Sequence, residues 1–226
     1  MTFLAFDTSG EFCVLALSDD SGAVQAVSIF EGKRTLSRRL LGEVDSLLTR
    51  NSLSLADLSA FAVGVGPGSF TGVRVGVTTA KTLAQVSGKP LIGIETLAAY
   101  AAVWSARSSE EIIAVVLPSR RGEVYAALFQ DGKCLEAPFA APIDEFTERL
   151  NTMERVIVCG DTRQLPSWKG TALTQFWTPP EGMATLASLR LAAGEADEVF
   201  GLIPLYVVAP SISPSKKNPP SAGDNP

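Results

Sequence analysis

The sequence predicts an α/β protein whose two halves repeat one order of elements: three strands, a helix, a strand and a helix. β-prone runs joined by short turn clusters alternate with stretches in which apolar residues recur at helical spacing. The pattern starts again after a polar stretch at residues 107–111. Apolar residues make up 46% of the 226 residues, which supplies a hydrophobic core and excludes a disordered or coiled-coil chain.

Three antiparallel strands are expected at the start of the chain. A short apolar run ends at Asp7, and two longer runs lie on either side of a turn cluster at residues 19–22, which predicts a hairpin. A helix is then predicted from about Thr35 to Arg50, because its apolar residues share one face, which Leu41 widens. This stripe consists of Leu36, Leu40, Val44, Leu47 and Leu48.

The same helix has candidate caps at both ends. Thr35 or Ser37 can cap its start, and Asn51 can end it in the left-handed conformation. The rest of the first half should contain a strand, a glycine turn, a helix, a strand and a helix. We predict these elements at residues 61–65, 66–69, 70–87, 91–94 and 96–106.

The second half repeats the pattern. Its three strands, helix, strand and helix are predicted at residues 112–117, 123–130, 133–137, 143–150, 155–159 and 184–193. Asp131-Gly132 is a strong hairpin turn within it. We therefore expect one domain at residues 1–106 and a second at 107–209. Residues 210–226 are rich in proline and serine and lack aromatic residues, so a disordered tail is expected there.

Charge and residue usage exclude several classes of site. The net charge of −5 argues against a chain that binds nucleic acid directly. Histidine is absent, which excludes a Ser-His-Asp triad, an HExxH zinc helix and any imidazole base.

Cys13, Cys134 and Cys159 lie in apolar surroundings and are expected to be buried in a reducing cytosol. No signal peptide or membrane span is evident, so we expect a cytoplasmic protein that does not contact a membrane.

A glycine-rich loop is the first candidate binding site. It contains Gly66, Gly68, Ser69 and Thr71, follows a predicted strand and opens a helix, so its amides can face a phosphate. The loop lacks the GK[ST] of a Walker A motif and the third glycine of a dinucleotide fingerprint. The alternative is a tight turn whose glycines permit unusual backbone angles.

Asp7 and Thr8 form the second candidate site. A carboxylate at the end of a strand, followed by hydroxyl groups, suits a magnesium–phosphate site. Alternatively, these residues only turn the chain into the hairpin. Arg120 and Arg121, which precede a predicted strand, can bind a phosphate or carboxylate or form a solvated turn.

The helix at 70–87 carries a stripe of small residues. Gly72, Gly76 and Ala80 lie four residues apart, with Val73 and Leu83 beside them. Such a stripe lets another helix approach closely, either from the same domain or from a partner. Glycine and β-branched residues lower the intrinsic propensity of this helix, so contacts with other elements must stabilise it.

Several segments closely resemble the bacterial TsaB (YeaZ) family. They are FLAFDTS at residues 3–9, GVGPGSFTGVRVGVTTAKTLA at 64–84, PLIGIETL at 90–97 and SRRGEVYAALF at 119–129. The resemblance covers about residues 1–130 well. It implies an actin/hexokinase-like fold made of two ribonuclease H-like halves, which agrees with the repeated order of elements.

The resemblance also implies a function. TsaB proteins are non-catalytic subunits that bind and activate their paralogue TsaD, which transfers a threonylcarbamoyl group to the tRNA adenosine next to the anticodon. The ATPase TsaE joins this complex. By this resemblance the chain requires no cofactor, although ATP or ADP with magnesium can bind at the complex. It contacts tRNA only through the complex, and it can form a homodimer in isolation.

The two helices at 35–50 and 70–87 are the expected contact with TsaD. The adjacent Leu40 and Leu41 cannot both point inward, so the first helix offers more leucines than one packing stripe needs. The expected interface consists of Leu40, Leu41, Val44, Leu47, Gly72, Val73, Gly76, Ala80 and Leu83.

Three positions depart from the family pattern. A histidine usual near Arg34-Thr35 is missing, Ser119 replaces an aspartate, and the arginine usual after Tyr206 is absent. The alternative function is an active ATPase or phosphotransferase of the same fold, which would use Asp7 and the loop at 66–71. The second half offers only residues 159–162, with one glycine, as a further phosphate loop, and this favours the non-catalytic subunit.

Overall fold

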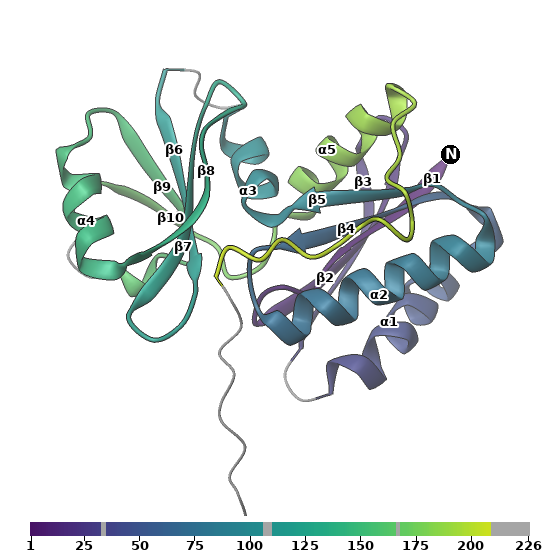
Figure 1. Ribbon diagram of the computed structural model, residues 1–226. Helices are drawn as coiled ribbons and strands as arrows, with labels where there is room; N and C mark the ends of the chain where they lie inside the picture. The colour runs from purple at the N-terminus through teal and green to yellow at the C-terminus, as the bar shows by residue number, and fades with distance from the viewer. Residues whose placement is uncertain (33–34, 106–109, 166–167, 209–226) are drawn as a thin grey trace, which may run out of the picture.

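The computed structural model describes residues 1–32, 35–105, 110–165 and 168–208 (Figure 1). Two five-stranded sheets stand beside each other, one from each half of the chain. The first has the order β3-β2-β1-β4-β5, and the second, read from its β8 edge, has the order β8-β7-β6-β9-β10. The two orders correspond strand by strand, so the predicted duplication is confirmed.

The strands agree with the predicted hairpins. Those of the first sheet are β1 (Thr2–Asp7), β2 (Phe12–Asp19), β3 (Val24–Glu31), β4 (Leu58–Gly66) and β5 (Leu91–Glu95). Those of the second are β6 (Ile112–Pro118), β7 (Glu123–Gln130), β8 (Lys133–Pro142), β9 (Val156–Gly160) and β10 (Thr171–Thr174). In each sheet the first three strands pair antiparallel, and the strands that follow pair parallel.

The short strand β10 is an element that the sequence pattern did not predict. It pairs in parallel with β9 along four residues that carry few apolar side chains, so no hydrophobic run marks it. Between β9 and β10 the described residues contain only a short 3₁₀ helix, Thr162–Gln164, where the first half has a long helix. The second half is therefore the shorter copy of the fold.

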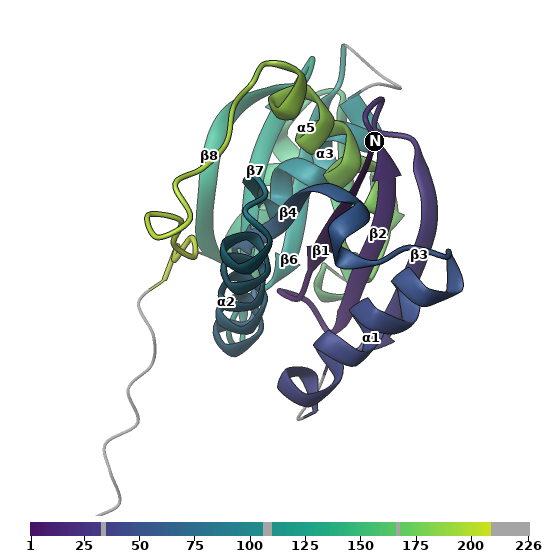
Figure 2. The ribbon, with the colours of Figure 1, turned by 90° about the vertical axis from the view of Figure 1, so that its right-hand side faces the viewer.

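The helices form three layers, and these alternate with the two sheets. Figures 1 and 2 show α1 (Leu36–Arg50) and α2 (Phe70–Ser87) on one face of the first sheet. On the opposite face, α3 (Thr96–Ser105) and α5 (Pro180–Ala192) lie between the two sheets, and α4 (Ile143–Thr152) covers the far face of the second. No helix among the described residues has both the length and the apolar composition needed to cross a membrane.

The two inner helices are exchanged between the halves. Met183 and Ala187 of α5, which comes late in the chain, pack in the core of the first sheet. Leu97 and Tyr100 of α3 pack against strands of the second sheet. The expected division at residue 107 lies between the two sheets in the chain, and each sheet buries its inner face with the help of a helix from the other half. The polar boundary at 107–111 lies largely outside the described residues, and so does the expected tail.

Close contact between α3 and α5 depends on one glycine. A Cβ added to Gly182 would lie 1.8 Å from the carbonyl oxygen of Ala99, so only glycine lets the helix backbones approach this far. The crossing of the two helices joins the two halves into one body.

The first helix follows its predicted stripe. Leu36, Leu40, Val44, Leu47 and Leu48 are its buried residues. Leu41 does not widen the buried stripe, since its side chain is 55% exposed. Thr35 occupies the predicted N-cap but makes no side-chain cap bond. The prediction for Asn51 is wrong: its φ is −103°, and Ser52 adopts the left-handed conformation with φ 58°. Instead, the Asn51 side chain donates to the carbonyl of Leu47 at 2.7 Å.

Two of the three cysteines are buried as predicted. Burial, reinforced by the negative charge of Asp7, raises the pKa of the Cys13 thiol to about 12. Burial also raises the pKa of Cys159. Cys134 is exposed, because it lies on β8 at the edge of the second sheet, so the prediction for this residue is wrong.

The C-terminal strap, residues 195–208, returns the chain to the first sheet (Figure 1). The backbone N–H of Asp197 donates to Leu91 at 2.8 Å, and that of Leu205 donates to Val65 at 2.8 Å. Arg190 binds the Asp197 carboxylate through both terminal nitrogens, at 3.0 and 3.1 Å. The backbone N–H of Gly93 donates to the same carboxylate at 2.6 Å.

We expect the attachment of the strap to weaken in acid. Burial alone would raise the pKa of Asp197, but the hydrogen bonds from Arg190 and Gly93 lower it below its usual value. The resulting stabilisation is complete above the ordinary aspartate pKa of about 3.9 and is lost as the pH falls through the lower folded pKa. Thermal unfolding from pH 7 to pH 3 should show Asp197→Asn less stable than the native protein, with a gap that narrows only below about pH 3.9. A gap independent of pH would contradict this role.

Candidate functional site

A cleft of about 880 Å³ lies between the two halves. Its first wall comes from the turn after β1 and from the starts of α1 and α2. Its second wall comes from the β6–β7 turn, the short 3₁₀ helix and the end of the strap. Among the candidate binding residues, Thr8, Gly68, Ser69 and Thr71 line this cleft. Asp7 and Gly66 do not.

Asp7 is the centre of a buried polar cluster behind this cleft. Its side chain is 1% exposed and packs over Gly64, where an added Cβ would come within 2.3 Å of the carboxyl carbon. The backbone N–H of Ser9 donates to Oδ1 at 2.6 Å. The hydroxyls of Thr96 and Thr178 donate to Oδ2 at 2.8 and 3.0 Å. The carboxylate thus joins the end of β1 to the start of α3 and to the segment that leads into α5.

This arrangement does not fit a magnesium ion on Asp7. The carboxylate is buried, does not line the cleft and already accepts three hydrogen bonds, so a metal ion held in the cleft would not meet it. Among the described residues, no three His, Cys, Asp or Glu side chains lie together as a metal-binding group. Asp7 therefore acts on this chain as a structural acceptor.

The glycine loop is bound to the chain itself. A cis peptide joins Gly66 to Pro67, and Gly66 has φ 99°. The backbone N–H of Ser69 donates to the carbonyl of Ser9 at 2.7 Å, and that of Gly72 donates to the Ser69 hydroxyl at 3.2 Å. Two amides that could have bound a phosphate thus have acceptors within the protein.

The small stripe of α2 contacts the turn after β1. An added Cβ would come within 2.1 Å of the Thr8 carbonyl oxygen at Gly72, and within 2.2 Å of the Thr8 hydroxyl at Gly76. The Thr8 hydroxyl also donates to the carbonyl of Gly72 at 2.7 Å. Gly72 and Gly76 of the stripe therefore pack within their own domain rather than presenting a free surface to a partner helix.

Most of the expected partner-interface residues lie inside the protein. Leu41 is exposed and Leu83 is half-buried, whereas the remaining positions pack against the protein's own sheet or the turn after β1. These buried positions are Leu40, Val44, Leu47, Gly72, Val73, Gly76 and Ala80. Any surface that α1 and α2 offer to a partner is made by their other residues.

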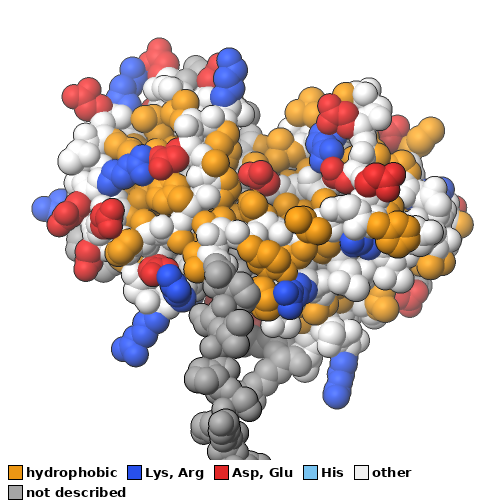
Figure 3. Space-filling view, in the orientation of Figure 1, with side chains coloured by type: hydrophobic (Ala, Val, Ile, Leu, Met, Phe, Trp, Pro, Cys, Tyr) orange, Lys and Arg blue, Asp and Glu red, His pale blue; other side chains and the backbone are white. Residues whose placement is uncertain are grey.

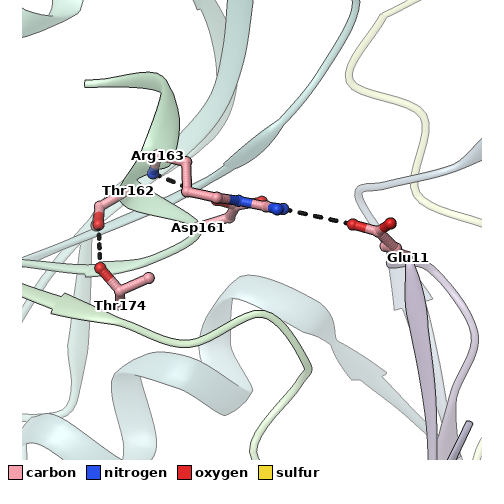
Figure 4. Close-up of polar contacts among 5 residues, drawn as sticks. All are labelled: Glu11, Asp161, Thr162, Arg163 and Thr174. Carbon is pink, nitrogen blue, oxygen red and sulfur yellow. Dashed lines mark hydrogen bonds and ion pairs between the residues drawn. The ribbon is translucent and has the colours of Figure 1, made fainter. Parts of the chain in front are cut away.

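An ion cluster bridges the cleft (Figure 4). Arg163 donates from Nε to the Asp161 carboxylate at 2.8 Å, and its guanidinium lies 4.4 Å from the centre of the Phe176 ring. It also lies 3.4 Å from Glu11 of the first half. The hydrogen bonds that Arg163 donates to Asp161 raise the pKa of Arg163, so the guanidinium stays charged. Thr162 and Thr174 also share a hydrogen bond beside this cluster.

The sequence reasoning missed the residues that complete these clusters. The sequence pattern marks Thr96 only as the start of a helix, and it gives no signal for Thr178 or Arg163. Asp161 lies in the candidate phosphate loop at residues 159–162, where it caps the short 3₁₀ helix. Ser119, which stands where the family has aspartate, lines the cleft, and Arg120 beside it pairs with Glu123 at 2.6 Å.

Comparison with known proteins identifies the family. The model of the TsaD family, tRNA N6-adenosine threonylcarbamoyltransferase, matches residues 31–201, which is more than half of the chain. The chain belongs to the TsaD family. It resembles the TsaB and YeaZ members of this group, as the opening and glycine-loop segments predicted.

Two relatives define this resemblance. TsaB of Escherichia coli K12 is 42% identical over 132 residues, which cover 58% of this chain and 55% of that protein. The chain thus matches about half the length of its curated relative. YeaZ from Pseudomonas aeruginosa has a TM-score of 0.72 at 27% identity, with 91% of this chain and 99% of that chain covered.

The fold class is confirmed beyond the TsaD family. An inorganic polyphosphate/ATP-glucomannokinase from Arthrobacter has a TM-score of 0.53 at 15% identity, with 86% of this chain and 99% of that chain covered. This likeness shows the fold alone. The protein has the actin/hexokinase-like fold, with Asp7 tied into its structure at the end of β1.

Proposed function

We propose that this chain is a non-catalytic subunit that binds and activates a TsaD enzyme in the threonylcarbamoylation of the tRNA adenosine next to the anticodon. The observation that carries the proposal is the outer face of α2, which has only two charged side chains in 18 residues. Arg74 and Lys81 are the charged residues of this helix. Both are held by other parts of the protein.

Arg74 and Lys81 are directed to the strap. The Arg74 guanidinium stacks 3.7 Å from the centre of the Phe70 ring and donates to the Tyr206 hydroxyl at 2.8 Å. The Lys81 ammonium donates to the carbonyls of Phe200 and Leu202 at 3.0 and 3.1 Å. The exposed positions that remain on α2 are Thr71, Thr78, Thr82, Gln85 and Val86.

A helix face with so few charged side chains is unusual for a surface helix and typical of a protein contact. Helices that face water normally carry charged residues on that side. The centres of protein interfaces are depleted of charge. On α1, the exposed Leu41 adds an apolar side chain to the surface of these two helices. Both features support a partner that covers α1 and α2.

The state of Asp7 supports a non-catalytic role. In an ATPase or phosphotransferase this carboxylate would have to be available for magnesium, and here it is buried and accepts three hydrogen bonds.

We infer that the chain needs no cofactor of its own and that any ATP or ADP with magnesium binds at the complex. By the same proposal TsaE joins the complex, tRNA contacts this chain only through it, and a homodimer can form without TsaD. The cytoplasm is the expected place of this reaction.

Binding to TsaD tests the proposal directly. Leu41→Glu and Thr82→Glu place charges on exposed positions of α1 and α2, so the variants should fold normally and lose affinity by tenfold or more. Leu189→Glu is the matched control, since Leu189 is 63% exposed on α5. Isothermal titration with the TsaD of the same organism measures the affinity, and formation of the modified adenosine measures activation.

Two outcomes would overturn this function. Native-like binding by both charge variants would place the contact elsewhere or remove it. Steady ATP hydrolysis by the pure chain, sensitive to substitution of cleft residues, would favour the alternative of an active ATPase.

A further inference from the structure

An apolar strip lies on the C-terminal strap beside α2. Phe200 and Ile203 are 75% and 71% exposed, and Val86 on the last turn of α2 is 84% exposed. Figure 3 shows hydrophobic side chains gathered over the strap and α2 on this side of the molecule. Large side chains that share one exposed face of a protein commonly mark a binding surface.

A groove of about 370 Å³ separates α2 from the strap. Its walls are Thr78, Lys81, Thr82, Gln85, Val86, Val199 and Phe200. The only charged group among these residues, the Lys81 ammonium, is bound to two strap carbonyls. The groove therefore offers hydroxyls, an amide and apolar side chains, and it suits apolar side chains of an incoming protein.

The strap is fixed before any partner arrives. Lys81 and Arg74 of α2 hold it near Leu202 and at Tyr206, while Leu205 is bonded to β4. The ring of Tyr206 also packs against Phe70, with 5.2 Å between the ring centres. A surface that is already ordered loses little conformational entropy when it binds.

We propose that the strap and α2 form one continuous docking surface, and that an apolar, uncharged segment of the TsaD subunit fills the groove between them. This inference rests on the proposed function, and it extends the contact from the two helices to the end of the chain. The groove shares Thr78, Thr82 and Val86 with the outer face of α2, so a partner that covers this face also covers the groove. A membrane is a poorer match, because the one cation in the groove is not available to anionic lipid.

Truncation of the strap side chains tests this surface. Phe200→Ser and Ile203→Ser remove exposed side chains, so each variant should keep the native melting temperature and bind TsaD about tenfold more weakly. Leu189→Ser is the matched control on α5, at 63% exposure, and should bind as the native chain does. Affinity is measured by isothermal titration, and the oligomeric state of each free variant by light scattering.

The outcomes separate this inference from the function on which it rests. If the strap variants bind normally while Leu41→Glu does not, the strap is outside the interface and the inference is wrong, whereas the proposed function stands. If Leu41→Glu and Thr82→Glu also bind normally, both fail. If the strap variants change only the self-association of the free chain, the groove holds a second copy, and the inference is again overturned.

Discussion

Asp7→Ala is expected to destabilise the isolated protein by about 3 kcal/mol or more, without any ligand present. The substitution leaves the Ser9 amide and the hydroxyls of Thr96 and Thr178 without their shared acceptor. Each buried donor that loses its partner costs roughly 1–3 kcal/mol. Chemical denaturation of the native and variant chains measures the change in the free energy of unfolding.

Two further variants identify the cause. Asp7→Asn keeps an oxygen for the Ser9 amide, and the two hydroxyls can turn to accept from its nitrogen, so it should lose much less stability than alanine. Asp45→Ala, at an exposed site on α1, should change stability by less than about 0.5 kcal/mol. If Asp7→Ala were as stable as the native chain, the carboxylate would not be a structural acceptor, and a ligand-binding role for it would return.

Gly76→Ala and Gly42→Ala should change stability in opposite directions, although both glycines lie inside helices. Alanine favours a helix over glycine by about 1 kcal/mol. At Gly42 an added Cβ meets nothing within 4 Å, so that gain should appear as increased stability. At Gly76 the added Cβ would lie 2.2 Å from the Thr8 hydroxyl, and the forced displacement should cost about 1–3 kcal/mol more than alanine gains.

Thermal and chemical unfolding of the two variants measure this difference. Helix content by circular dichroism should remain native in Gly42→Ala. Equal effects of the two substitutions would show that the contact between α2 and Thr8 yields easily, and that the small stripe remains available to a partner. By the same geometry, a bulky residue at Gly76 or a charge at the buried Val44 would disturb the core. A loss of binding in such a variant would therefore not identify an interface.

Local chemistry made the elements predictable. The stripe from Leu36 to Leu48 repeats with the period of a helix, and the described structure buries those five residues of α1. The hairpin at Asp131-Gly132 follows from residues that tolerate positive φ, and both have it, at 49° and 70°. Gly88 ends α2 in the left-handed conformation for the same reason, with φ 65°. Each of these features depends on neighbours in the sequence.

The candidate site was less predictable because its residues have two roles that look alike in sequence. A carboxylate followed by hydroxyls and a glycine loop suits either a phosphate site or a tight, self-bonded turn. Asp7, Gly68 and Gly72 are equally suited to a phosphate site and to a tight turn, so residue type does not distinguish the two. The choice depends on which donors reach Asp7 and on what an added Cβ would strike, and neither quantity can be read from spacing.

The sequence by itself determined the strands other than β10, most helix boundaries and, through the glycine-loop segment, the resemblance to TsaB proteins. Only the tertiary structure decided that Asp7 is a structural acceptor, since Thr96 and Thr178 lie 89 and 171 residues away along the chain. It also decided that α3 and α5 are exchanged, that the small stripe faces inward and that the strap lies against α2. These contacts join distant parts of the chain, and hydrogen bonding and close packing select them only when the whole fold brings those parts together.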